Sequence, residues 1–243
     1  MSENMEDDLL GLLDSKEDAF VKKEEPVVQN TGVSSVGADG KINLWEDTNI
    51  PKVPFNTAHL HNVDKSFAIF LHTGEGGLPP EIEEKFIELS KVLLGKGFIY
   101  RYGGDNNNDL YGKILNIEGG LIDTYLPWKK FNTTVTAKLS KPTEQAYKHA
   151  MHYHLGFAKM KPTVRAMLAK DVHVLVGEDC KRPVRFMICY TPDGCETKEK
   201  INYKTTGFAS FPITVACAAN IPVFNLKNDD AVNRLVEYIK TIN

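Results

Sequence analysis

The sequence predicts an α/β protein with an open, mostly parallel sheet flanked by helices. Three observations predict this fold. From residue 65 onward, short apolar runs alternate with segments of helical periodicity. Several runs, such as FAIFL at 67–71 and FMICY at 186–190, are apolar throughout, which is typical of strands covered on both faces. Glycine-rich and polar stretches follow the ends of the runs, where sheets of this kind bind their ligands.

Five strands are predicted, and each is bounded by small or polar residues. They are KSFAIFLHTG (65–74), GFIYRYGG (97–104), LIDTYLPW (121–128), RFMICYTPDG (185–194) and IPVFNL (221–226). The second strand ends in a bare Gly-Gly pair, preceded by Arg101 and followed by polar residues that cap helices. This stretch indicates either an anion site or only a turn.

Six helices are predicted between and after the strands. They are 78–97, 105–117, 142–154, 162–177, 208–220 and 229–243. In the first of them Pro80 lies near the start, and glutamates fill the first turn, where the helix dipole favours acids. Asp105 or a neighbouring asparagine is the expected cap of the second helix. The alternation predicts a Rossmann-like, doubly wound domain over residues 63–243.

Residues 1–62 are predicted to form an acidic, mostly disordered arm. Residues 1–25 hold nine acidic and three basic side chains, a net charge of −6, and the rest of the arm lacks periodicity. The leucines at 9, 10, 12 and 13 indicate either a frayed, solvated helix or a docking motif over residues 7–14 that enters a partner's groove.

Charge and hydropathy narrow the function classes. No apolar run approaches the roughly 20 residues that a membrane-spanning helix needs, and the acidic N-terminus is unlike a secretory signal, so a cytoplasmic location is expected. Beyond residue 25 the chain holds 26 basic and 23 acidic side chains, a net charge of +3, which suits small anionic ligands better than duplex DNA. The four cysteines lack metal-ligand spacing, so no metal site is expected.

The candidate ligand-binding residues lie at the expected carboxyl edge of the sheet. They are Thr73, Gly74, Arg101, Gly103, Gly104, Asp109, Trp128, Lys129, Thr191, Asp193, Lys204, Thr206 and Gly207. The basic side chains Arg101, Lys129 and Lys204 are expected to meet phosphate, and the glycines allow a ligand close to the backbone. Asp109 and Asp193 are expected to meet ribose or to position water. The histidines of 149–154 are expected to be structural, with His154 or His173 as alternative site residues.

The two best-known phosphate fingerprints are absent from the sequence. The stretch HTGEGG at 72–77 lacks the GxGxxG spacing, and no GxxxxGK[ST] occurs. This excludes a standard dinucleotide dehydrogenase and a P-loop ATPase, and no cofactor is expected.

Taken together, the motifs resemble the SLOG superfamily, which includes DprA-like and LOG-like nucleotide-binding proteins. The resemblance rests on RYGG at 101–104 with Asp109, YLPWKKFN at 125–132, VRAMLAKDVHVLVGED at 164–179, FMICYTPDG at 186–194 and ANIPVFNL at 219–226. It spans roughly residues 65–240 and implies a phage-type protein in a bacterial cytoplasm that binds a nucleotide or a nucleotide-derived signal. It also implies a homo-oligomer, because relatives often pair through helices.

The chain departs from the hydrolytic members of that group. Those members carry PGGxGTxxE, whose glutamate serves catalysis, whereas here FASFPITVA follows Gly207 without an acid at the matching position. Binding is therefore favoured over catalysis. A nucleotide N-glycosidase remains an alternative, with Asp109 or Asp193 as the carboxylate that the reaction requires.

Two further alternatives involve macromolecules. A DprA-like single-stranded DNA-binding protein is one, because aromatic residues for base stacking lie near basic ones. These are Tyr102, Tyr111, Trp128 and Phe131, beside Arg101, Lys129 and Lys130. An adaptor that recruits a protein partner through residues 7–14 is the other.

Overall fold

The computed structural model describes residues 65–105 and 109–242 of the 243-residue chain. The predicted arm at 1–62 and its docking segment at 7–14 lie outside the described residues. The five predicted strands and six predicted helices are all present in the described part, with narrower bounds, so the predicted α/β fold is confirmed.

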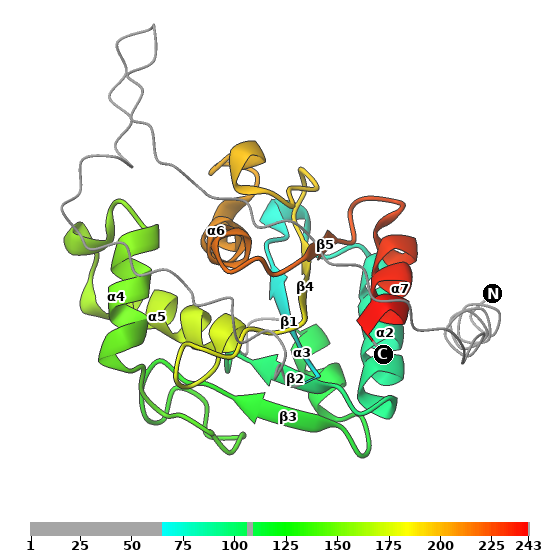
Figure 1. The fold of residues 1–243 in the computed structure, drawn as a ribbon, viewed down its shortest axis with the longest axis horizontal. Coiled ribbons are helices and arrows are strands. Elements are labelled where there is room, and N and C mark those ends of the chain that lie inside the picture. Colours follow the sequence, from blue (N-terminus) through cyan, green and yellow to red (C-terminus); the bar gives the residue numbers. More distant parts are fainter. Residues whose placement is uncertain (1–64, 106–108, 243) are drawn as a thin grey trace, which may run out of the picture.

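All neighbouring strands of the five-stranded sheet pair in parallel, in the order β3-β2-β1-β4-β5 (Figure 1). The strands are β1 (Ser66–Leu71), β2 (Ile99–Tyr102), β3 (Leu121–Thr124), β4 (Phe186–Tyr190) and β5 (Val223–Asn225). The chain moves outward from β1 to β3, then returns to place β4 on the other side of β1. The order therefore reverses between β1 and β4, and open α/β sheets bind ligands at such a switch point.

Helices cover both faces of the sheet, as a Rossmann-like fold requires (Figure 1). One face packs against α2 (Pro80–Gly95), α3 (Asp109–Leu115) and α7 (Ala231–Ile242). The other packs against α5 (Pro162–Val176) and α6 (Ser210–Ala218), and α4 (Glu144–Tyr153) packs on α5 and α6 from outside. Short 3-10 turns η2 (Gly74–Gly76), η3 (Phe157–Lys159), η4 (Lys198–Lys200) and η5 (Gly207–Ala209) complete the described elements.

The helix starts follow from local chemistry. Pro80 opens α2 and Pro162 opens α5, since proline at the first position has no N–H to leave unsatisfied. Thr143 caps α4, where its hydroxyl accepts a hydrogen bond from the backbone N–H of Ala146 at 3.3 Å.

An aromatic cluster centred on Phe186 of β4 anchors the sheet to α7 and to the turn between α2 and β2. Its fully buried ring lies 5.7 Å from the ring of Phe98 and 6.2 Å from that of Tyr238, between ring centroids. Burying one such ring contributes about 1.5–3 kcal/mol. The cluster holds the sheet together behind its carboxyl edge.

No helix among the described residues has the length and apolarity to cross a bilayer.

Candidate functional site

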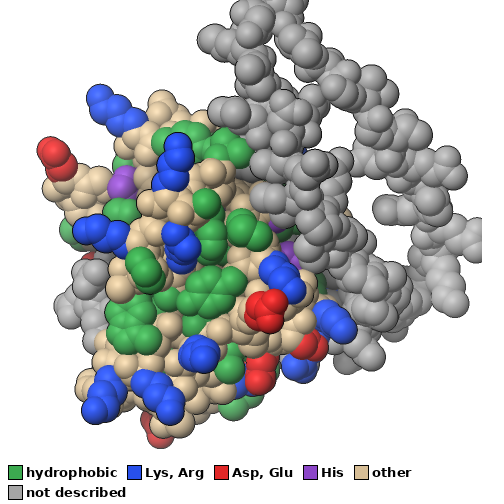
Figure 2. All heavy atoms as spheres, turned by 90° about the vertical axis from the view of Figure 1, so that its left-hand side faces the viewer, with side chains coloured by type: hydrophobic (Ala, Val, Ile, Leu, Met, Phe, Trp, Pro, Cys, Tyr) green, Lys and Arg blue, Asp and Glu red, His purple; other side chains and the backbone are tan. Residues whose placement is uncertain are grey.

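A cavity of about 1050 Å³ opens at the carboxyl ends of β1 and β2, beside the switch point. Its size suits a small-molecule ligand. Five predicted site residues line it: Thr73, Gly74, Gly104, Trp128 and Lys204. Figure 2 views the face toward which the arrowheads of β2 and β3 point, and hydrophobic side chains gather in its middle with Lys and Arg around them.

The Gly103-Gly104 pair is required by packing. A Cβ atom on Gly103 would lie 2.7 Å from Nζ of Lys170, and one on Gly104 would lie 2.3 Å from Cδ2 of Leu126. Gly104 also has a φ of +77°, which side chains rarely adopt. The pair therefore makes room for neighbouring side chains, while the backbone of Gly104 still forms part of the cavity wall.

The lysine beneath the glycine pair belongs to a buried ion cluster. Lys170 of α5 is 1% exposed, and its Nζ lies 2.8 Å from Oδ2 of Asp105 and 2.8 Å from Oδ1 of Asp171. Asp105 follows β2, where the sequence predicted a helix cap, but the structure turns its carboxylate to Lys170 instead. All three residues line the cavity. We call them the Asp105–Lys170–Asp171 cluster.

The cluster shifts the protonation equilibria of its members. Burial raises the pKa of Asp171 to about 6, although the ammonium of Lys170 opposes that rise. Burial alone would lower the pKa of Lys170, but the two carboxylates outweigh it and raise that pKa above its ordinary value. The cavity floor thus holds an ammonium that stays charged and a carboxyl group that titrates near neutrality.

The mouth of the cavity is aromatic. The rings of Trp128 and Phe131 meet edge to face, with 4.9 Å between their centroids, and both residues line the cavity. Phe208 of η5 also lines it and is 88% exposed, which is unusual for a large apolar side chain. These rings offer flat faces on which a planar ligand group can stack.

The aromatic residue Phe208 is positioned by contact between η5 and the turn after β1. Its ring packs edge-on against the imidazole of His72, with 5.9 Å between the ring centroids. Gly207 has a φ of +53°, and a Cβ there would lie 2.1 Å from Nε2 of His72. A glycine at 207 therefore allows η5 to approach the imidazole closely and to present Phe208 at the cavity mouth.

Asp193, predicted to meet ribose or water, instead ties two loops together. Its carboxylate accepts hydrogen bonds at 2.7 Å from each of the hydroxyls of Thr191, Thr205 and Thr206, and one at 3.2 Å from the N–H of Cys195. Burial pushes the pKa of Asp193 up, but these hydrogen bonds outweigh it and lower that pKa below its ordinary value. The loop after β4 is thereby fixed to the segment that precedes η5.

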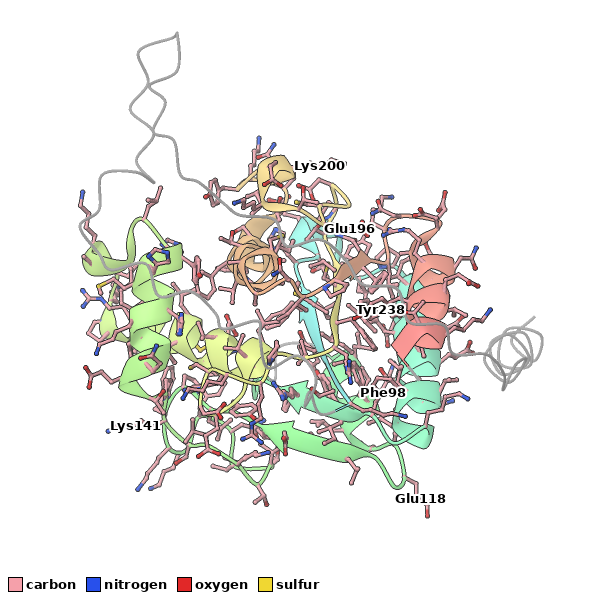
Figure 3. The ribbon with its side chains drawn as sticks, viewed as in Figure 1. Phe98, Glu118, Lys141, Glu196, Lys200 and Tyr238 are labelled. Atoms are coloured by element: carbon pink, nitrogen blue, oxygen red, sulfur yellow. The ribbon has the colours of Figure 1, made fainter. Side chains whose placement is uncertain are left out.

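The same loop is also tied to α7 and β5. A carboxylate oxygen of Glu196 accepts hydrogen bonds at 2.7 Å from the backbone N–H of Asn225 and at 2.7 Å from Nη2 of Arg234. Figure 3 shows Glu196 beside β5 and Lys200 farther out on η4. The loop after β4 is therefore fixed to β5 and α7 as well as to the segment that precedes η5.

Other predicted residues lie apart from the cavity. Arg101 is 3% exposed in β2, and its Nη1 donates a hydrogen bond to the carbonyl oxygen of Arg182 at 2.6 Å. Among the described residues, the cavity lining does not include Arg101, Gly103, Lys129, Thr191, Asp193, Thr206 or Gly207. The backbone of Asp109 begins α3, but its side chain lies outside the described residues. The structure thus brings together only part of the predicted set.

Two histidines that the sequence offered as alternative site residues, His154 and His173, serve the framework. His173 accepts a hydrogen bond on Nε2 from the N–H of Thr143 at 3.0 Å, and its Nδ1 lies 2.8 Å from the carbonyl oxygen of Gly177. Nδ1 is therefore the protonated nitrogen. His154 ends α4, and its Nδ1 accepts a hydrogen bond from the N–H of Gly156 at 3.2 Å. Burial lowers the pKa of both rings.

Sequence reasoning missed Lys170 and Asp171, the charged residues of the cavity floor. Their signal is a Lys-Asp pair within the otherwise apolar helix AMLAKDVHVLV at 166–176. Lys170 lies one helical turn from buried Ala166 and His173. A charge at such a position must be paired or must serve a site.

Comparison of the chain with protein-family models, with curated proteins and with solved structures found no match. The fold and the cavity define the class on their own. The chain is an α/β, Rossmann-like protein with a ligand-sized cavity beside the switch point of its sheet.

Proposed function

We propose that the protein binds a nucleotide, or a small molecule derived from one, in the cavity at the carboxyl edge of the sheet. The observation that carries this proposal is the position of an aromatic-walled cavity beside the switch point, against the turn that follows β1. The resemblance to SLOG proteins points the same way, and we propose that the chain is a phage-type member that captures or senses a host nucleotide signal.

The cavity offers partners for the base and for the phosphate of a nucleotide. Trp128, Phe131 and Phe208 provide stacking faces for the base. Thr73 and Gly74 form part of the wall after β1, and Lys204 adds positive charge at the same cavity. Phosphate is therefore expected near Lys204 and the turn after β1, rather than at the buried Arg101.

The experiment that tests the proposal is mass spectrometry of the small molecules released when the purified full chain is heat-denatured after incubation with a pool of nucleotides. Intact nucleotide at about one per chain is the expected result. No nucleotide above the level released by a heat-treated, unrelated protein would contradict the proposal.

A nucleotide N-glycosidase is a second candidate function, favoured by the placement of Asp171 in the cavity wall. The reaction needs a carboxylate to activate the water that attacks the sugar carbon while the carbon–nitrogen bond to the base breaks. Asp171 is a better candidate than Asp193, whose carboxylate accepts four hydrogen bonds outside the cavity. Release of free base and sugar phosphate into the nucleotide pool, abolished by Asp171→Asn, is the expected sign of this activity.

A further inference from the structure

We propose that the Asp105–Lys170–Asp171 cluster selects the ligand by its base, favouring bases that carry an exocyclic amino group over the corresponding bases without one. This inference rests on the proposed function, because it concerns the same cavity. The base that stacks on the aromatic rings would turn its edge toward the cluster, and the inference names the chemical group on that edge that the cluster recognises.

The cluster has more hydrogen-bond acceptors than donors. Its two carboxylates offer about eight lone-pair sites, whereas one ammonium offers three N–H donors. Nζ of Lys170 donates a hydrogen bond to Oδ2 of Asp105 at 2.8 Å, and it lies 2.8 Å from Oδ1 of Asp171, a buried atom that has no hydrogen-bond partner among the described residues. Asp105 and Asp171 both line the cavity, so their remaining acceptors adjoin the space that a ligand would fill. A ligand group that donates N–H bonds satisfies them, whereas a carbonyl oxygen does not.

The charge of the cluster points to the same ligand group. One carboxylate is enough to neutralise Lys170, so the second leaves the cluster with a net charge of −1 when both are ionised. A purely structural pair gains nothing from this excess, because an unpaired charge with little solvent contact is costly. The side chain of Asp105 is 31% exposed and that of Asp171 is 14% exposed, so water compensates the excess only in part. A donor group on the ligand compensates it directly.

The cluster is also closely packed, which favours specificity. Gly103 leaves the space that Nζ of Lys170 occupies, since a Cβ at 103 would lie 2.7 Å from that atom. Asp171 belongs to the same helix as Lys170, and the chain reaches Asp105 directly from β2. A site with fixed acceptors rejects a ligand that leaves them unpaired, because each unpaired buried group costs about 1–3 kcal/mol.

The test is isothermal titration of the full chain at pH 7.5 with two matched pairs of nucleotides. Guanosine and inosine monophosphates differ only by the 2-amino group. Cytidine and uridine monophosphates differ by an amino group in place of the 4-carbonyl oxygen and by the proton on N3, which uridine alone carries, so the guanosine and inosine pair is the cleaner comparison. The amino-bearing member of at least one pair is expected to bind about tenfold more tightly, which corresponds to about 1.4 kcal/mol.

Two variants assign the preference to the cluster. Asp171→Asn keeps the size of the side chain but removes its charge, so it should bring the members of the discriminated pair within about threefold of each other. Asp179→Asn makes the same change at a half-exposed carboxylate near Arg182 and should leave the preference intact. Thermal melting of each variant checks that it is folded, and Asp105→Asn replaces Asp171→Asn if the latter does not fold.

The outcomes separate the two proposals. Equal binding within both pairs, or tighter binding of the members without the amino group, overturns this inference and leaves the proposed function standing. Absence of binding by all four nucleotides overturns the proposed function, and this inference with it. A preference that survives Asp171→Asn and Asp105→Asn overturns the assignment to the cluster.

Discussion

Nζ of Lys170 lies 2.8 Å from a carboxylate oxygen of Asp105, although 65 residues separate the two in the chain. The contact joins the middle of α5 to the loop after β2, across the floor of the cavity. It explains why residue 103 is a glycine, since any side chain there would meet the ammonium. The cavity floor is therefore built by a charge pair that links two segments far apart in the sequence.

Replacing Lys170 should destabilise the fold. Lys170→Met leaves two carboxylates without their cation, so we expect a loss of about 3–5 kcal/mol in the free energy of unfolding, measured by urea denaturation. Lys148→Met is the matched control, because the pair of Lys148 with Glu144 is solvent-exposed and should contribute little to stability. Equal effects of the two substitutions would contradict the buried cluster.

The glycine pair gives a steric prediction. Gly104→Ala combines a positive φ with a 2.3 Å approach to Leu126, so it should destabilise the fold by about 2–4 kcal/mol. Gly112→Ala is its control, because Gly112 lies in α3 with no atom within 4 Å of an added Cβ. That substitution should be neutral or stabilise by up to about 1 kcal/mol. Urea denaturation of both variants tests the difference, and a tolerated Gly104→Ala would refute the packing described.

Asp193 should matter for the loops more than for the ligand. Because its pKa is lowered in the folded state, its contribution to stability is fully present above its ordinary pKa of 3.8 and is lost as the pH falls through the lowered value. Asp193→Ala should lower the free energy of unfolding by about 1–2 kcal/mol at pH 7, a figure reduced because the side chain is partly exposed to solvent. It should also make the free energy of unfolding depend less on pH in the acid range. Chemical denaturation between pH 2 and pH 7 measures both effects, with Asp229→Ala as an exposed control. Loss of ligand binding in a folded Asp193→Ala protein would place it in the site after all.

Ligand binding should depend on pH through Asp171. Its pKa is raised to about 6 by burial, so the carboxyl group takes up a proton as the pH falls through that value. The charged groups that face it are Lys170 and Asp105, and the neutral phenol of Tyr111 adjoins them. Since an amino group on the ligand needs the ionised form, affinity for the preferred amino-bearing nucleotide should rise from pH 5 to pH 7 and then level off. Titration calorimetry across this range measures it. An unchanged pH profile in Asp171→Asn would contradict the assignment, because another group that lines the cavity, such as Glu75 or His72, would then have to cause it.

The sheet was predictable because its signals are local. The run FMICY at 186–190 is buried at every residue, as its continuous apolarity predicted for a strand covered on both faces. The turns after the strands were likewise marked by glycine, proline and polar residues. Each of these signals lies within a few residues of the element that it predicts.

The sequence predicted where the site lies, at the carboxyl edge of the sheet, but not which side chains line it. Arg101 precedes the glycine pair in sequence, but strand pairing buries it between β1 and β3, where it bonds to Arg182. Asp193 lies at the expected strand end, but hydroxyls at 205 and 206 occupy its carboxylate. Such contacts join distant segments, so no local pattern predicts them. Three expectations stay predictions: a protein partner of the arm, the binding of single-stranded DNA, and the formation of a homo-oligomer.

The central claim, that the cavity binds a nucleotide, is tested most directly by calorimetric titration of nucleoside monophosphates into the full chain and two aromatic variants. Phe208→Ala removes an 88% exposed ring from the cavity mouth, whereas Tyr203→Ala removes a 67% exposed ring that does not belong to the described cavity lining. We expect both variants to fold as the unaltered chain does. Phe208→Ala should weaken binding about tenfold, in keeping with about 1–3 kcal/mol for base stacking, and Tyr203→Ala should not. Equal affinity in all three proteins, or no binding by any, would contradict the account.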